Sequence, residues 1–235
     1  MSKIPVIAIY GYSNSGKTSL VTELIKDLTE KEYDVCTIKH TPKDISIGPG
    51  KKDTSRHIAS GSKLTVFSTG TETDFCFPDE IKLGHIVEII GETGDCDIVL
   101  AEGYKGSSIP KIAVGKIDEK ENTIARYDGN FEDLVELIEQ EIRINRIKQG
   151  LPGLDCGLCG FEDCREMAEA IEDGKREASD CRVLEEKGVE LRVNGEDVPL
   201  ERFPANIIKG GLRGMLSTLK GVDGDIKNIS IDASF

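Results

Sequence analysis

The sequence Gly11-Tyr12-Ser13-Asn14-Ser15-Gly16-Lys17-Thr18 decides the fold of this chain, because it fits the phosphate-binding pattern G-x-x-x-x-G-K-[ST]. The apolar, β-branched run at residues 4–10 precedes it and is typical of a buried strand. Apolar residues at helical spacing follow it, at positions 20, 21, 24, 25 and 28. A strand, a glycine-rich loop and a helix are the context that this motif requires. The sequence therefore predicts a loop that binds the phosphates of a nucleotide.

Each residue type in this loop has a physical role. Gly11 and Gly16 let the backbone turn tightly and approach a ligand closely. Successive backbone N–H groups form an anion nest, and the N-terminus of the following helix adds partial positive charge. We expect Lys17 to reach the β and γ phosphates and the Thr18 hydroxyl to ligate Mg²⁺. The predicted nucleotide-binding residues of the loop are Gly11, Tyr12, Ser13, Asn14, Ser15, Gly16, Lys17, Thr18 and Ser19.

Strand and helix patterns alternate through residues 1–148. The apolar runs predict further strands at 34–38, 64–68, 97–101, 109–114 and 123–125, and helices at 53–57, 81–90 and 131–146. Alternation of this kind is typical of the α/β class, with a mostly parallel sheet flanked by helices, as in P-loop NTPases. Such sheets bind ligands beyond the carboxyl ends of their strands.

Hydrolysis needs a second group near Mg²⁺ and the γ-phosphate. Glu102 ends the apolar strand 97–101, so it would face the nucleotide and hold Mg²⁺ or a water bound to it. Gly103 could bring a backbone N–H to the γ-phosphate. Asp97 is the alternative carboxylate, at the wrong end of the strand for direct contact. We therefore expect Lys17 and Glu102 to be the catalytic pair.

Two further segments could close over the phosphates. Lys39 and His40 end a strand at the same edge of the sheet, although His40 could equally be a surface residue. The second segment is the start of the helix predicted at 53–57. Base recognition is weakly indicated: residues 115–118, Gly-Lys-Ile-Asp, partly resemble the guanine-binding pattern N-K-x-D, but glycine replaces the asparagine. We interpret residues 115–118 as a charged loop after a strand.

Composition limits the possible partners. The 235 residues carry a formal charge of −13, and an acidic surface argues against non-specific binding to nucleic acids or membranes, which depends on basic patches. No apolar stretch approaches the ~20 residues that span a bilayer. The N-terminus leads straight into the first strand without a signal-peptide pattern. We expect a cytoplasmic protein.

The cysteines indicate a metal site. Seven cysteines without an export signal suggest a reducing compartment. Cys36, Cys76 and Cys96 are scattered among apolar residues, and we interpret them as small buried hydrophobes. Cys156, Cys159, Cys164 and Cys181 form the pattern C-x2-C-x4-C-x16-C. Three close thiolates and one distant thiolate favour a 4Fe–4S cluster over a zinc ion, which usually takes two close pairs. Zinc remains the alternative.

The chain is predicted to contain three parts. Residues 1–148 form the nucleotide-binding domain, residues 149–185 the iron–sulfur segment, and residues 186–235 a small αβ unit. In the last part we expect strands at 189–193 and 197–200 around an Asn194-Gly195 hairpin turn. A helix at 203–219 and a final strand at 226–231 complete it.

These residues together resemble the molybdopterin-guanine dinucleotide biosynthesis protein B (MobB) family over about residues 4–145. The resemblance lies in the phosphate loop, Lys39-His40-Thr41, Asp53 with Arg56 ahead of Ser60-Gly61, and Glu102-Gly103-Tyr104-Lys105. The cysteine segment resembles the 4Fe–4S module of corrinoid and acetyl-CoA-pathway proteins, which is fused to this family in anaerobic archaea. The resemblance implies a GTP-binding, weakly hydrolysing homodimer. Such a protein assists the attachment of GMP to molybdopterin beside a MobA-type nucleotidyltransferase.

Other functions stay open at this point. An ATP-driven electron donor like the nitrogenase iron protein also joins a phosphate loop to a 4Fe–4S cluster, but Tyr12 and Ser13 stand where that family carries an extra lysine. A small-molecule kinase needs a basic, mobile lid, and the 41–52 loop offers only lysines at 43, 51 and 52. A module that binds nucleotide without turnover is a fourth candidate. The sequence leaves undecided GTP or ATP, molybdenum or tungsten, and the role of the cluster.

Overall fold

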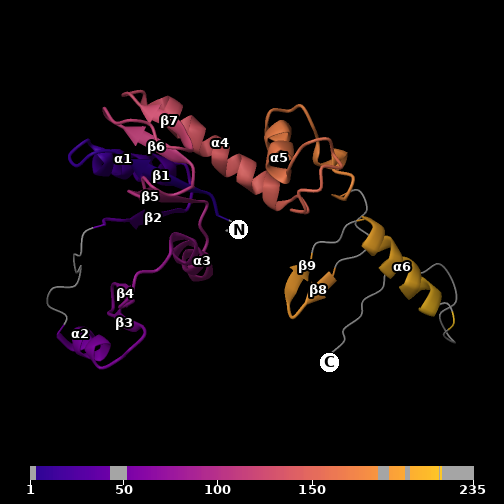
Figure 1. The fold of residues 1–235 in the computed structure, drawn as a ribbon, viewed down its shortest axis with the longest axis horizontal. Helices are drawn as coiled ribbons and strands as arrows, with labels where there is room; N and C mark the ends of the chain where they lie inside the picture. The colour runs from indigo at the N-terminus through magenta and orange to yellow at the C-terminus, as the bar shows by residue number, and fades with distance from the viewer. Residues whose placement is uncertain (1–3, 43–51, 185–190, 199–201, 217, 219–235) are drawn as a thin grey trace. The chain divides into compact units, whose positions relative to one another are not determined.

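The computed structural model describes residues 4–42, 52–184, 191–198, 202–216 and 218, and its chain divides into two units, 1–142 and 143–235 (Figure 1). The first unit contains a five-stranded, wholly parallel sheet in the order β2-β5-β1-β6-β7. Its strands are β1 (Val6–Tyr10), β2 (Val35–Lys39), β5 (Ile98–Glu102), β6 (Lys111–Val114) and β7 (Thr123–Tyr127). The predicted parallel α/β sheet is therefore confirmed.

Both faces of this sheet are covered, because alternate side chains of a strand point to opposite faces. On one face, Ile7, Ile9 and Leu100 pack with buried residues of α1 (Lys17–Glu30) and α4 (Phe131–Gln149). On the other face, Val99 and Ala101 pack with Val87 of α3 (Leu83–Thr93). Burial on both faces explains the continuous apolar runs in the sequence. The sheet is thus a fixed platform for the loops at its carboxyl edge.

One predicted strand does not join this sheet. The run at 64–68 forms β3 (Thr65–Ser68), which pairs antiparallel with β4 (Thr73–Cys76), a strand that the sequence analysis missed. The connection between them has four residues, too few for the crossover that a parallel pair needs. The interpretation of Cys76 as buried is also wrong, since this thiol is exposed on the hairpin, whereas Cys36 and Cys96 are half-buried beside β2 and β5. The helix before the hairpin is α2 (Lys52–Ala59).

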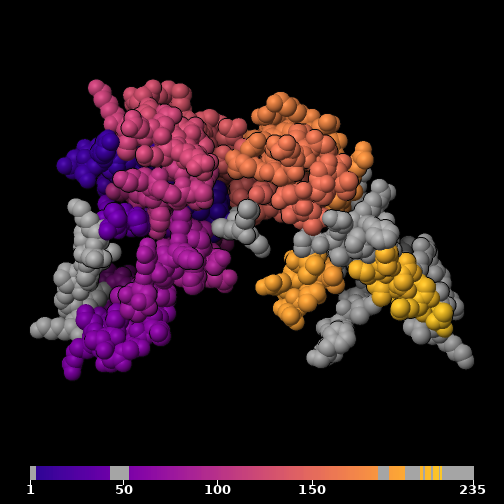
Figure 2. All heavy atoms as spheres, viewed as in Figure 1, coloured from indigo at the N-terminus to yellow at the C-terminus, as the bar shows by residue number. Residues whose placement is uncertain are grey.

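The second unit begins inside α4. Its core packs Ile144 of α4 and Leu151 against Met167 and Ala168 of α5 (Cys164–Glu172), and residues 143–184 form one closely packed body (Figure 2). A short 3-10 helix, η1 (Ala178–Asp180), leads to Cys181.

The last described elements are a hairpin and a helix. The hairpin of β8 (Leu191–Val193) and β9 (Glu196–Val198) has the predicted Asn194-Gly195 turn, with φ of 54° and 86°. Positive φ at both positions is the geometry of a type I′ turn. The helix α6 spans Arg202–Leu216, and the predicted strand at 226–231 lies outside the described residues. Among the described residues, no helix is both long and apolar enough to cross a membrane.

Candidate functional site

The phosphate-binding loop connects β1 directly to α1. Gly16 stands before the first helical residue, Lys17, with φ of 90°, in the left-handed region that favours glycine. No side chain among the described residues caps this helix end, and its first turn carries no acidic residue. The free N–H groups and the helix dipole therefore face outward, as an anion requires.

Close packing at the start of the loop explains the need for Gly11. A Cβ at Gly11 would lie 2.5 Å from the carbonyl oxygen of Val114 and 2.6 Å from Ser15 Oγ. Ser15 Oγ itself is buried and has no hydrogen-bond partner in the described part of the chain. An unpaired buried hydroxyl costs free energy, so this group fits a loop that receives polar atoms of a ligand. These features are compatible with bound phosphate.

Replacing Gly11 by alanine should lower the free energy of unfolding by about 1–3 kcal/mol, the usual cost of overpacking. The added Cβ would meet the backbone carbonyl of Val114, which cannot move freely. The loop would therefore shift, and nucleotide binding should be abolished. The matched control is Gly84→Ala in α3, where an added Cβ meets no atom within 4 Å. Urea unfolding of both variants checks the prediction. Equal stability of Gly11→Ala and wild type would contradict it.

The predicted metal-binding side chains lie beside each other. Thr18 Oγ1 donates to the Glu102 carboxylate, at 3.0 Å from both Oε1 and Oε2. Lys39 Nζ lies 3.3 Å from Glu102 Oε2 and forms an ion pair with it. Lys17 Nζ donates to the carbonyl oxygen of Tyr12 at 2.5 Å, across the loop. The structure thus brings together Thr18, Glu102 and Lys39 from α1, β5 and β2.

The turn after Glu102 is held by the end of β2. The His40 N–H donates to the Glu102 carbonyl at 2.9 Å, and the His40 ring stacks on Tyr104 with centroids 4.3 Å apart. Gly103 has φ of 111°, and a Cβ there would lie 2.7 Å from the His40 carbonyl oxygen. Burial, with a smaller effect of the Glu80 charge, raises the pKa of the Tyr104 phenol. His40 therefore packs against Tyr104 and positions Gly103.

The rest of the loop is open to solvent. Tyr12 is 62% exposed, and Ser13, Asn14 and Ser19 are exposed as well. Asn14 has φ of 63°, which asparagine tolerates better than most residues. Asp97 lies at the opposite end of β5, where its carboxylate accepts the Asp34 N–H at 3.0 Å. As expected, Asp97 is remote from the loop.

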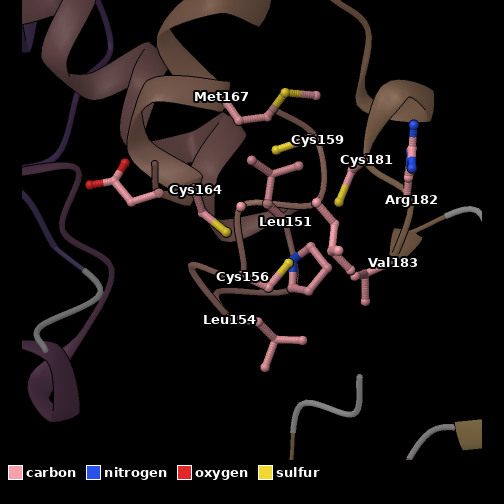
Figure 3. A pocket seen from close by; sticks show the side chains of 13 residues that line it. Leu151, Leu154, Cys156, Cys159, Cys164, Met167, Cys181, Arg182 and Val183 are labelled. Atoms are coloured by element: carbon pink, nitrogen blue, oxygen red, sulfur yellow. The ribbon is translucent and has the colours of Figure 1, made fainter. Parts of the chain in front are cut away.

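The four clustered cysteines line one pocket in the second unit (Figure 3). Cys164 opens α5, and Cys181 follows η1, so the cysteine that is distant in sequence lines the same pocket as the other three. Cys164 and Cys181 are buried, and Cys156 and Cys159 are half-buried. Asp163 and Arg182 also line the pocket, but most of the other lining residues are apolar, among them Leu151, Pro152, Leu154, Leu158, Met167 and Val183. The thiols are therefore gathered in an apolar environment.

Local geometry shapes this cysteine loop. Gly157 and Gly160 have φ of 71° and 90°, which lets the loop wrap tightly. Asp155, which the sequence analysis did not assign, accepts the Cys164 N–H at 2.8 Å through Oδ1. No motif marks this aspartate, because its contact depends on the fold of the loop. Burial raises the pKa of the Cys164 thiol, so a bound metal would have to stabilise its thiolate.

The side chains in the described part of the chain do not converge on a single metal ion, and this includes the four cysteines. Within the described ranges, no three His, Cys, Asp or Glu side chains come close enough to form a recognisable single-ion site. The cysteine pocket fits a metal group by the softness of its four sulfur donors.

Comparison with known proteins agrees with these features. Residues 6–139 match the family model "Molybdopterin guanine dinucleotide synthesis protein B" (MobB), and residues 151–183 match the model "Putative Fe-S cluster". The chain is 32% identical to the "Putative molybdopterin-guanine dinucleotide biosynthesis adapter protein" of Methanocaldococcus jannaschii over 230 residues, 93% of each chain. It is 29% identical to the "Molybdopterin-guanine dinucleotide biosynthesis adapter protein" of Haemophilus influenzae, covering 70% of this chain and 95% of that protein.

Among solved structures, MobB of Bacillus subtilis aligns with 59% of this chain and 98% of its own, with 16% identity and a TM-score of 0.47. The family model covers more than half of the 235 residues, and the M. jannaschii relative is similar over nearly the whole length. The chain therefore belongs to the MobB family.

Proposed function

We propose that this protein is a GTP-binding, weakly hydrolysing adapter in molybdenum or tungsten cofactor biosynthesis, which assists the formation of molybdopterin guanine dinucleotide. The observation that carries the proposal is the contact of Glu102 with both Thr18 and Lys39 beside the phosphate loop. The names of the relatives from M. jannaschii and H. influenzae support the pathway.

Each side chain at the loop has a role in this proposal. The loop amides and Lys17 bind the phosphates, and Lys17 stabilises the negative charge that develops on them. Thr18 and Glu102 hold Mg²⁺, which neutralises phosphate charge when bound. Lys39 is within reach of the same carboxylate and is available to the terminal phosphate.

An adapter acts through partners. We propose a homodimer in the cytoplasm that cooperates with a MobA-type nucleotidyltransferase and its pterin cofactor. The net charge of −13 supports a role without nucleic acid or membrane binding.

The second unit is proposed to carry a 4Fe–4S cluster on Cys156, Cys159, Cys164 and Cys181. Their common pocket and the match of residues 151–183 to the iron–sulfur family model support this assignment. Cys164 is the first residue of α5, so the helix dipole would favour the negative charge of a cluster held there.

The test of the nucleotide site is Glu102→Gln. We expect Mg²⁺-dependent GTP hydrolysis to fall by about 10-fold or more, because the amide is a weaker ligand for a hard cation. The matched control is Glu139→Gln. Its carboxylate has the same side-chain exposure, 14%, and also pairs with a lysine, Lys31, at 3.1 Å.

Phosphate release, measured with and without Mg²⁺, separates the two variants. A reconstituted assay with a MobA-type enzyme, molybdopterin and GTP then measures the dinucleotide product. Unchanged hydrolysis in Glu102→Gln would disprove the metal site, and no effect of the wild-type protein on dinucleotide formation would disprove the adapter role.

A further inference from the structure

Two cysteines of the first unit, Cys36 and Cys96, meet on one face of the parallel sheet. Cys36 stands in β2, and Cys96 stands in the connection between α3 and β5. Both side chains are half-buried, and both pack against the core cluster that contains Val87 and Val99. The fold therefore brings together two thiols that are far apart in the sequence.

The backbone around Cys96 places its thiol against the paired strands β2 and β5. The Cys96 thiol donates to the carbonyl oxygen of Ile98 at 3.3 Å. Ile98 is the register partner of Val35, the residue before Cys36. The Cys36 side chain is hydrogen-bonded to the Cys96 sulfur. Because a disulfide has an S–S length of about 2.0 Å, a small further approach of these two side chains would join them.

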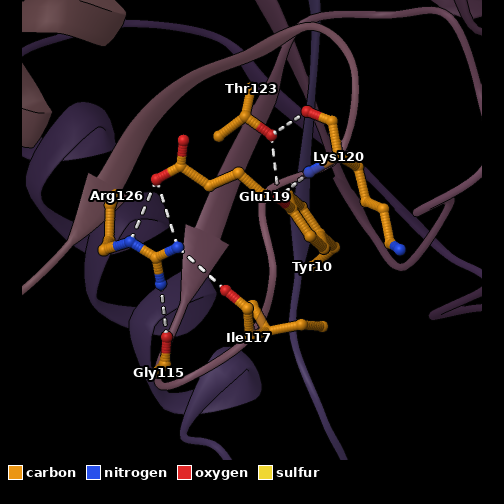
Figure 4. A network of polar contacts seen from close by, with 7 residues as sticks. All are labelled: Tyr10, Gly115, Ile117, Glu119, Lys120, Thr123 and Arg126. Carbon is orange, nitrogen blue, oxygen red and sulfur yellow. Dashed lines mark hydrogen bonds and ion pairs between the residues drawn. The ribbon is translucent and has the colours of Figure 1, made fainter.

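The two edges of the sheet are held in different ways. At the β7 edge, the Tyr10 hydroxyl accepts the Lys120 N–H at 2.9 Å (Figure 4). Arg126 of β7 donates to the carbonyl oxygens of Gly115 and Ile117 at 2.7 Å and 2.8 Å. In the strand order β2-β5-β1-β6-β7, β2 forms the opposite edge and has β5 as its neighbour. The attachment of β2 to the sheet therefore depends on β5.

The thiol pair lies near one end of these two strands. Just before the strands, the Asp97 N–H donates to the Asp34 carbonyl oxygen at 2.8 Å, and the Asp34 N–H donates to the Asp97 carboxylate at 3.0 Å. At the other end, Lys39 of β2 pairs with Glu102 of β5 at 3.3 Å. A covalent bond near the first end would fix the strand that carries Lys39.

We propose that Cys36 and Cys96 are a redox-active pair, which a low-molecular-weight disulfide oxidises to an intramolecular disulfide that locks the edge strand β2 to the sheet. This role goes beyond the interpretation of both residues as small hydrophobes. In a reducing compartment, disulfides are mostly transient and serve catalysis or redox sensing. The bond therefore forms when the thiol–disulfide balance becomes oxidising, and reduction removes it.

The exchange has two steps that conserve atoms and electrons. The Cys36 thiolate attacks one sulfur of the disulfide RSSR, forms a mixed disulfide and expels RS⁻. The Cys96 thiolate then attacks the Cys36 sulfur and expels the second RS⁻. The protein loses two electrons and two protons, and RSSR becomes two molecules of RSH. Burial, followed by the contact with Cys36, raises the pKa of the Cys96 thiol to about 12, so Cys36 is the residue that attacks first.

The test begins with disulfide mapping of the full-length protein. Anaerobically purified wild-type protein is incubated with oxidised glutathione, and its remaining thiols are alkylated. Its peptides are then analysed by mass spectrometry without reduction. We expect one pair of peptides joined through Cys36 and Cys96, with two hydrogen atoms fewer than the separate reduced peptides. Dithiothreitol should separate them.

Oxidation should also stabilise the first unit, most strongly at β2. A bond that closes a loop of about 60 residues restricts the unfolded chain, so the melting temperature should rise by about 5 °C or more. Amide hydrogen exchange in β2 should become slower. Exchange in β7 should change less, since Tyr10 and Arg126 hold that edge in both states. The β7 edge is therefore an internal reference.

Three variants separate this pair from the other cysteines. Cys36→Ser and Cys96→Ser should each abolish the joined peptides and the rise in melting temperature. Cys76→Ser is the matched control and should retain both, because this thiol is exposed on the β3–β4 hairpin. The peptide map and the exchange rates of wild-type protein decide the question even if a serine variant does not fold.

Three results would overturn the proposal. The first is a map in which Cys36 and Cys96 stay alkylated, carry only glutathione, or are joined to other cysteines. The second is a pair of joined peptides without slower exchange in β2, since the bond would then not hold the strand. The third is a rise in melting temperature that persists in Cys96→Ser. None of these results bears on the nucleotide site, which lies at the opposite, carboxyl edge of the sheet.

Discussion

Replacing Lys17 by alanine should weaken GTP binding by about 100-fold or more while the fold is retained. The Lys17 side chain is half-buried and, among the described residues, donates a hydrogen bond to the Tyr12 carbonyl oxygen. The proposed contacts with two phosphates are charge-assisted hydrogen bonds, each worth about 1.5–3 kcal/mol. Their loss corresponds to the expected change, since 1.4 kcal/mol is a factor of ten in affinity. Titration with a fluorescent GTP analogue measures it.

The matched control for Lys17 is Lys26 on the same helix. Lys26 pairs with Glu30 at 3.9 Å on the exposed face of α1, so Lys26→Ala should leave the affinity unchanged. Circular dichroism of both variants checks that α1 is intact. If Lys17→Ala binds GTP as tightly as wild type, the phosphate loop does not bind the nucleotide and the proposed function fails.

Serine substitution of any one of the four clustered cysteines should remove most of the bound iron. We expect anaerobically purified wild-type protein to contain about four irons and four sulfides per chain, as one 4Fe–4S cluster requires. Cys76→Ser is the control, since this thiol is exposed on the β3–β4 hairpin. Iron, zinc and acid-labile sulfide are measured for each variant.

Loss of the cluster should also unfold the second unit. Cys164 and Cys181 belong to the small core formed with Leu151 and Met167, so removal of a metal group that joins them removes much of its support. GTP binding by the first unit should persist, because its core is separate. Zinc without sulfide in the wild-type protein would show that the cysteines hold a different metal.

The parts that could be predicted from sequence are those with local signals. The loop at 11–18 needs a strand before it and a helix after it, and both are present because local apolar patterns specify them. The placement of Glu102 at the carboxyl edge followed from its position at the end of an apolar run. The Asn194-Gly195 hairpin followed from the φ values that this dipeptide favours.

The parts that were missed depend on contacts between distant residues. Arg126 reaches Gly115 and Ile117 only because β6 and β7 pair, and arginine in a strand carries no motif. The strand β4 is short and exposed, so its sequence lacks the apolar run that marks a buried strand. β4 pairs with β3 as a hairpin because only four residues connect the two strands. This short connection can be recognised only after both strands have been identified.

The ion pair of Lys39 with Glu102 has a consequence for the kinetics of ligand entry. A carboxylate beside the loop, on a chain of net charge −13, repels an approaching triphosphate. Lys39 compensates for that charge locally while no cation is bound. Mg²⁺ and Lys39 would compete for the carboxylate oxygens of Glu102. A nucleotide that arrives already complexed with Mg²⁺ carries less negative charge, so this carboxylate repels it less than it repels the free anion. In the proposed site, the concentration of free Mg²⁺ therefore controls the association rate as well as the final occupancy.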